Sequence, residues 1–170
     1  ITICIDSKIW IKYYPNIDKK IKQILRRSIN SEKNFVHKNT EITVLLTNSD
    51  KMKFLNYKFR KMKKDTDILS FPNERPLFYE KKIINKNIYL GDIALSYDYI
   101  SKQKQKFDIY LKKILVHGFL HLIGHNHKNN KSYLKMEIRN FSGRHFAGRA
   151  NAKLQTLHHF IIVFWLVIRK

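Results

Sequence analysis

The chain has 170 residues and a mass of 20.5 kDa, and its 34 Lys and Arg against 13 Asp and Glu give a formal net charge of +21. This length suffices for one domain with a hydrophobic core, and only five Gly and three Pro exclude a repeat-built or low-complexity chain. The charge favours a polyanionic partner, either nucleic acid or an anionic membrane surface. An AT-rich genome, which enriches Lys, Ile and Asn together, is the competing explanation.

The first part of the chain is predicted to form a strand, a helix and a second strand. Residues 1–5 are apolar and β-branched and indicate a strand. Asn16 or Asp18 can cap a helix to about Ser31, which places isoleucines and a leucine on one face. Residues 40–47 are mostly apolar and β-branched, and they predict another strand.

A second helix and a third strand are predicted next. Ser49 or Asp50 is expected to cap the helix, in which aromatic and apolar residues recur near helical spacing. Residues 67–71 indicate a strand that Pro72 stops. Residues 73–86 are polar and irregular, as in a loop or hairpin.

The last clear elements are a strand and a long helical stretch. Residues 87–95 predict a strand broken by Gly91. Ser96 or Ser101 opens helical sequence that leads into a histidine-rich run. Because strands and helices do not alternate strictly, the expected class is α+β, a small mixed β-sheet packed with helices.

The C-terminal part of the chain differs from the rest. Residues 1–137 are expected to form a single domain, and residues 138–170 an atypical segment rich in Gly and Arg at its start. Its apolar run, Phe160–Ile168, has nine residues, whereas a bilayer-spanning helix needs about 20. The run is interpreted as a core-packing segment, with a membrane-surface anchor as the alternative. No stable membrane association is expected.

Two features bear on location. The single cysteine, Cys4, excludes an intramolecular disulfide and fits a reducing compartment. The first ten residues lack the basic head and long apolar stretch of a secretory signal. A cytoplasmic location is therefore expected.

A run of histidines, HGFLHLIGHNH (117–127), is the main candidate for a functional site. His117 and His121 are four residues apart, so on a helix they share a face. Gly124 can end that helix in a left-handed cap, after which the chain can turn and bring His127 back toward the pair. Three imidazoles with a fourth position open are the arrangement of a catalytic zinc site.

Several alternatives to a zinc enzyme remain open at this stage. The histidine spacing is that of the metzincin metalloproteases, but Gly118 replaces the Glu that serves them as general base, which disfavours a peptidase. His125 could compete as a ligand, and a fourth protein ligand would indicate a structural zinc clip. The histidines could also simply stabilise a helix C-terminus.

Four segments together resemble the YbeY-type family of endoribonucleases, which mature ribosomal RNA. They are Leu55-Asn56 with Arg60, the heptapeptide TDILSFP (66–72), the tetrapeptide LGDI (90–93) and the histidine run 117–127. They occur in the family's order and spacing over about residues 40–137. The resemblance implies a compact α+β metalloenzyme with one Zn²⁺ per chain.

The resemblance also assigns residues and activity. It implies that His117, His121 and His127 bind the zinc and that Arg60 is the functional arginine. The implied activity is cleavage of single-stranded RNA in ribosomal RNA maturation, including the 3′ end of 16S rRNA, and in ribosome quality control. The implied partners are ribosomal RNA and the small ribosomal subunit. A non-catalytic ribosome-binding factor is the remaining alternative.

The chain departs from the family pattern at three places, and two of its residues allow a second interpretation. His125 stands where the family has an aromatic residue, Asn126 where it has Asp, and the pattern is lost after Glu137. Arg60 could instead be a solvated cation at a helix end. Asp67 could either orient a ligand histidine or cap a backbone turn.

Overall fold

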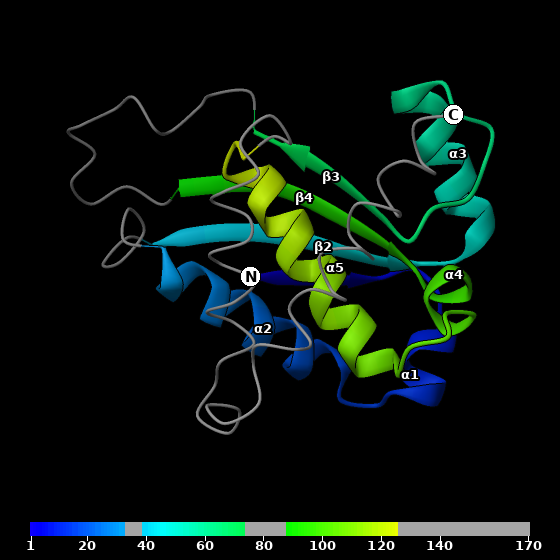
Figure 1. Cartoon of the computed structure of the whole chain (residues 1–170), viewed down its shortest axis with the longest axis horizontal. Coiled ribbons are helices and arrows are strands. Elements are labelled where there is room, and N and C mark those ends of the chain that lie inside the picture. Colours follow the sequence, from blue (N-terminus) through cyan, green and yellow to red (C-terminus); the bar gives the residue numbers. More distant parts are fainter. Residues whose placement is uncertain (33–38, 74–87, 126–170) are drawn as a thin grey trace, which may run out of the picture. The chain divides into compact units, whose positions relative to one another are not determined.

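A computed structural model describes residues 1–32, 39–73 and 88–125 of the chain. All of them belong to one compact unit, Ile1–Asn129. In these ranges a mixed β-sheet is packed with helices, as Figure 1 shows, which confirms the predicted α+β class. The predicted domain boundary at residue 137 and the segment 138–170 lie outside the described residues.

Four strands form the sheet of the described part of the chain. Their spatial order is β1 (Thr2–Ile5), β2 (Thr40–Thr47), β4 (Ile88–Ser96) and β3 (Ile68–Pro72). β2 pairs in parallel with both β1 and β4, whereas β3 runs antiparallel to β4. The pairing is mixed because β4 follows β3 in the chain and runs back beside it, whereas β1 and β2, and β2 and β4, are separated in the chain by helices.

Strand β4 continues through Gly91, so the predicted break there is wrong. Glu41 of β2 pairs with Tyr89, and Ile42 pairs with Gly91, which makes Leu90 the extra residue of a β-bulge. Gly91 has a φ of 131°, and a Cβ there would lie 2.2 Å from the Phe71 carbonyl oxygen. The glycine therefore permits the bulge without ending the strand.

The helices α1 and α2 follow β1. α2 (Ile17–Ser31) begins as predicted and buries an apolar stripe that includes Ile21 and Leu25. α1 (Ile9–Tyr13) was not predicted, because a single turn leaves no detectable period. It is anchored by Trp10, which is fully buried and donates an indole hydrogen bond of 2.9 Å to the Thr47 carbonyl.

The other helices begin at caps that differ in part from those predicted. α3 (Ser49–Arg60) is capped by Asn48, whose side chain accepts a hydrogen bond from the Lys51 N–H, and not by Ser49 or Asp50. The predicted helical stretch after β4 is divided into α4 (Tyr97–Ser101), which Ser96 caps, and α5 (Phe107–Leu122).

The long helices cover opposite faces of the sheet. A Cβ at Gly118 of α5 would contact Ile68 and Ser70 of β3, so α5 lies against the face to which these even-numbered residues point. Leu69 points the other way and packs with Met52 of α3. Figure 1 shows α5 running beside α2 on its face, and α3 apart from both. Among the described helices, none is long and apolar enough to cross a membrane.

Candidate active site

His117 and His121 converge at the C-terminal end of α5. Their Nε2 atoms are 3.0 Å apart, and their ring centroids are 4.5 Å apart with the planes at 80°. The four-residue spacing places one ring above the other on a single helix face. The structure thus brings together two of the three predicted ligands.

The helix ends as the sequence predicted. Gly124 has a φ of 83°, its N–H donates to the His121 carbonyl, and the His125 N–H donates to the Leu120 carbonyl, each over 3.0 Å. These two bonds form a Schellman motif, in which a left-handed glycine turns the chain away from the helix axis. His127 lies outside the described residues, so its place in the ligand set stays a prediction.

The histidine pair fits a metal ion. Two imidazole nitrogens that bind the same tetrahedral zinc ion lie roughly 3.3 Å apart, given zinc–nitrogen bonds of about 2.0–2.1 Å. The observed 3.0 Å separation is close to that value. Within residues 1–32, 39–73 and 88–125, no group of three His, Cys, Asp or Glu side chains could hold a metal, and the third predicted ligand, His127, lies outside these ranges.

Gly118 is buried on the side of α5 that faces the sheet. A Cβ there would lie 2.6 Å from Ile68 Cδ1, 3.0 Å from Ser70 Oγ and 3.4 Å from Ile93 Cδ1. A carboxylate at this position would therefore meet the sheet before it could reach a ligand beside the histidines. Both the identity of the residue and its surroundings oppose a metzincin-type general base.

Arg60 is the last residue of α3 and is exposed. Helix α3 packs on the face of the sheet opposite to the one that α5 covers, so Arg60 and the two histidines come from helices on different faces. β3, the last strand in the described order, separates the two helices. The catalytic role of Arg60 stays a prediction.

Asp67 caps a turn and anchors α5. One carboxylate oxygen accepts hydrogen bonds from the Ile68 N–H at 2.8 Å and the Thr66 hydroxyl at 3.2 Å, and the other accepts from the Tyr110 hydroxyl at 2.7 Å. Tyr110 lies about two helical turns before His117. Of the two interpretations of Asp67, these contacts support the turn cap.

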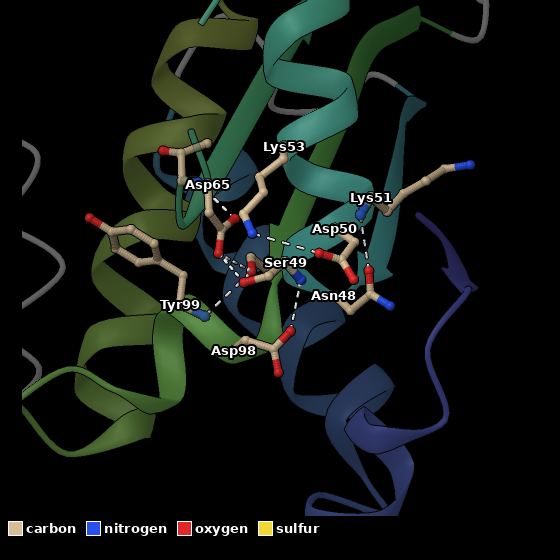
Figure 2. A network of polar contacts seen from close by, with 10 residues as sticks. Asn48, Ser49, Asp50, Lys51, Lys53, Asp65, Asp98 and Tyr99 are labelled. Atoms are coloured by element: carbon tan, nitrogen blue, oxygen red, sulfur yellow. Dashed lines mark hydrogen bonds and ion pairs between the residues drawn. The ribbon is translucent and has the colours of Figure 1, made fainter. Parts of the chain in front are cut away.

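Figure 2 shows a polar network that sequence reasoning missed. The Asp65 carboxylate accepts hydrogen bonds from the hydroxyls of Ser49 and Ser96, and Asp98 accepts from the Ser49 N–H at 2.7 Å. The network joins the start of α3, the segment before β3 and the start of α4. Ser49 follows β2 and Ser96 ends β4, and the carboxyl ends of these parallel strands lie at the same edge of the sheet. This placement is the sequence signal from which the network could have been predicted.

The fold and the histidine pair define a class: a small α+β protein with a candidate metal centre at the end of a central helix. The model of the family described as Endoribonuclease YbeY matches residues 6–142. The chain therefore belongs to the YbeY endoribonuclease family, which confirms the resemblance drawn from its motifs. The family consists of hydrolases that act on RNA phosphoester bonds.

Two curated endoribonucleases agree with this assignment. The chain is 43% identical to the endoribonuclease YbeY of Pelagibacter ubique over 107 residues, which are 60% of this chain and 66% of the relative. It is 31% identical to that of Ehrlichia chaffeensis over 140 residues, 78% and 86% of the two chains. The first alignment thus spans just under two thirds of the relative. The solution structure of TM1509 from Thermotoga maritima aligns with a TM-score of 0.47 at 22% identity, over 81% of this chain and 85% of that one.

Proposed function

We propose that this protein is a zinc-dependent endoribonuclease that cleaves single-stranded RNA in the cytoplasm during ribosomal RNA maturation, at the 3′ end of 16S rRNA, and in ribosome quality control. Its partners would be ribosomal RNA and the small ribosomal subunit. The observation that carries the proposal is the convergent His117–His121 pair, followed by the turn at Gly124, in a member of this family.

His117, His121 and His127 would hold the metal. When bound, a zinc ion on three imidazoles supplies a Lewis acid for a phosphoryl oxygen and lowers the pKa of a water molecule to about 7. The helix fixes the first two rings, because their side chains project from consecutive turns of α5. Because Gly118 adds no carboxylate beside the histidines, the site would not repel a negatively charged substrate such as RNA.

Arg60 would contact an RNA phosphate. A guanidinium donates two parallel hydrogen bonds to phosphate oxygens and keeps its charge at all physiological pH values. The proposed role is to stabilise negative charge on the scissile phosphate. Because α3 lies on the other sheet face, this role requires the RNA strand to cross the edge of the sheet at β3.

Metal content of purified histidine variants tests the ligand set. The His117→Ala, His121→Ala and His127→Ala proteins should each lose most of their zinc. The His125→Ala protein is the matched control, since it removes a neighbouring imidazole, and it should retain about one zinc per chain. Full zinc in the His127→Ala protein together with loss in the His125→Ala protein would overturn the assignment.

Cleavage of a single-stranded ribosomal RNA fragment tests the enzyme. Arg60→Ala should lower kcat by roughly 10²-fold or more, the scale for losing one preorganised electrostatic donor, without changing zinc content. Arg60→Lys should rescue cleavage poorly, because lysine lacks the two-pronged geometry. If Arg60→Ala raised KM and left kcat unchanged, Arg60 would contact a neighbouring phosphate and not the scissile one. Unchanged cleavage in both Arg60→Ala and His117→Ala would indicate a contaminating nuclease, and a zinc-clipped binding factor would then be the better account.

A further inference from the structure

Helix α3 carries three aromatic rings that the fold leaves about half exposed. Phe54 is 56% exposed, Tyr57 is 48% exposed and Phe59 is 56% exposed, and all three lie within six residues of the chain. Met52 and Asn56 supply the buried side of the same helix. The packing of α3 on the sheet therefore does not account for Phe54 and Tyr57, which share the opposite side at a spacing of three residues.

Each of these rings lies beside a lysine. The Lys51 ammonium is 5.9 Å from the centroid of Phe54, Lys63 is 5.4 Å from Tyr57, and Lys58 is 5.4 Å from Phe59. We call these six residues the aromatic–lysine surface. Cation–π contacts at exposed sites contribute little to folding, about 0.5–1 kcal/mol each, so stability alone does not explain why large rings are left in water.

The chemistry of this surface matches a single nucleic acid strand. Flat exposed rings offer stacking partners for unpaired bases, and adjacent ammonium groups neutralise phosphates. A duplex would not fit as well, because its bases are already stacked and paired. An apolar protein partner would not call for a lysine beside every ring. We infer that α3 and the turn after it bind single-stranded RNA, with bases stacked on Phe54 and Tyr57 and phosphates on the lysines.

Strand β3 lies between the aromatic–lysine surface and the candidate active site. Phe59 packs edge-on against Phe71 of β3, with ring centroids 4.8 Å apart. Ser70, the preceding residue of the strand, faces Gly118 beside His117. Arg60 follows Phe59 directly. An RNA strand on α3 would thus pass Arg60 and the edge at β3 to reach the histidines. This inference rests on the proposed function and adds where the substrate is held outside the cleavage site.

The test measures binding of the full-length protein to two fluorescent probes by anisotropy, over times short relative to cleavage. One probe is a 12-nucleotide oligouridine and the other is an abasic ribose-phosphate oligomer with the same charge. The Phe54→Leu/Tyr57→Leu protein should lose affinity for oligouridine by roughly 5-fold or more, the lower end for losing one stacked base, and should bind the abasic probe as the wild type does. Its far-ultraviolet circular dichroism and melting temperature should match those of the wild type.

Matched variants separate stacking from charge. Tyr13→Leu is the control, because Tyr13 of α1 is also exposed and has Lys12 5.5 Å from its ring centroid, and it should leave both affinities unchanged. Lys51→Gln/Lys58→Gln should weaken binding of both probes and reduce the salt slope by roughly 0.7 per lysine. Phe54→Trp should retain affinity, with its tryptophan emission quenched by oligouridine.

The inference would be overturned by wild-type affinity in the Phe54→Leu/Tyr57→Leu protein, by an equal loss for the abasic probe, by an equal loss in the Tyr13→Leu protein, or by unquenched emission in the Phe54→Trp protein. If the Phe54→Leu/Tyr57→Leu protein bound oligouridine normally but no longer associated with purified small ribosomal subunits, the surface would bind protein instead. That result would also overturn the inference. Failure of the proposed function is distinguishable, because zinc-loaded wild type would then bind oligouridine through α3 without cleaving it.

Discussion

Gly118 shows how one residue links the packing of α5 to the chemistry of its histidines. It sits next to His117 in sequence, yet it faces β3 and β4, where an added Cβ would crowd Ile68 and Ser70. The same position in the metzincin pattern carries the general base. The close approach of helix and sheet therefore disfavours a side chain as large as a general base at position 118.

Gly118→Glu should destabilise the protein without creating peptidase activity. The new carboxylate would be forced between α5 and the sheet, and overpacking plus an unpaired buried charge should lower the free energy of unfolding by roughly 3 kcal/mol. Urea unfolding measures this loss. Gly118→Ala is the control and should cost much less, because Ile68 Cδ1 is the end of a flexible side chain and alanine favours the helix by about 1 kcal/mol. Near-wild-type stability of Gly118→Glu would show that position 118 is not enclosed.

The hydrogen bond from Tyr110 to Asp67 should make stability depend on alkaline pH. Burial, and then the charge of Asp67, raise the pKa of the Tyr110 phenol. The folded state thus favours the neutral phenol, and its contribution is complete below the unfolded pKa of about 10 and is lost as the pH rises above it. Urea unfolding between pH 7 and 11 should show this decline.

Tyr110→Phe is the matched variant for this effect. It removes the hydroxyl that Asp67 accepts from, so it should lower stability by about 1–3 kcal/mol at pH 7, and its decline above pH 10 should be shallower than that of the wild type. Some decline should remain, because burial also raises the pKa values of Tyr89, Tyr97 and Tyr99. Parallel pH profiles for the two proteins would refute the assignment of this effect to Tyr110.

Sequence reasoning at the residue scale succeeded where contacts are local. The His117–His121 pair and the left-handed Gly124 follow from helical spacing and from the backbone freedom of glycine, and both are present. The position of Arg60 depends on which sheet face α3 covers, and the partner of Asp67 is 43 residues away in sequence. Such long-range placements are set by tertiary packing, which no local pattern encodes.

At the scale of elements, the cap of α3 gives a direct test of where the helix begins. Asn48→Ala should lower the free energy of unfolding by about 1 kcal/mol, because the Lys51 N–H loses its acceptor. Asn48→Asp should be nearly neutral, since aspartate caps equally well. Asp50→Ala should have a smaller effect, because the Asp50 side chain is 91% exposed in its ion pair with Lys53. Chemical denaturation of the three variants provides the comparison, and equal losses for Asn48→Ala and Asp50→Ala would favour the cap predicted from sequence.

Strands and helices were predictable to different degrees for physical reasons. β2 matches its predicted range because Ile42, Val44 and Leu46 alternate into the core, which is the period of a strand with one face buried. The turn between α4 and α5 was missed, because helical periodicity does not show where a short helix stops. The bulge of β4 at Leu90 was wrongly predicted as a break at Gly91, because a glycine within a strand is compatible with a bulge as well as with the end of the strand.

At the scale of the whole molecule, the family match extends further along the chain than the compact unit that contains the described residues. The family model ends at residue 142, and the compact unit that contains the described residues ends at Asn129. The net charge of +21 is spread over the chain, but on α3 it meets exposed aromatic rings, which composition alone could not reveal. The chemistry of the site is thus expected to depend on the chain up to about residue 142.

Ending the chain after Ser142 should leave the zinc site intact. The family match covers residues 6–142, and the predicted ligand His127 lies within it. The shortened protein should retain about one zinc per chain and the melting temperature of the full chain. It should also aggregate less, because it lacks the apolar run Phe160–Ile168, which lies beyond the family match. Metal analysis, thermal unfolding and light scattering of the two proteins provide the measurements. If the shortened protein fails to fold, the last 28 or so residues belong to the core, and the core-packing interpretation of that run is correct.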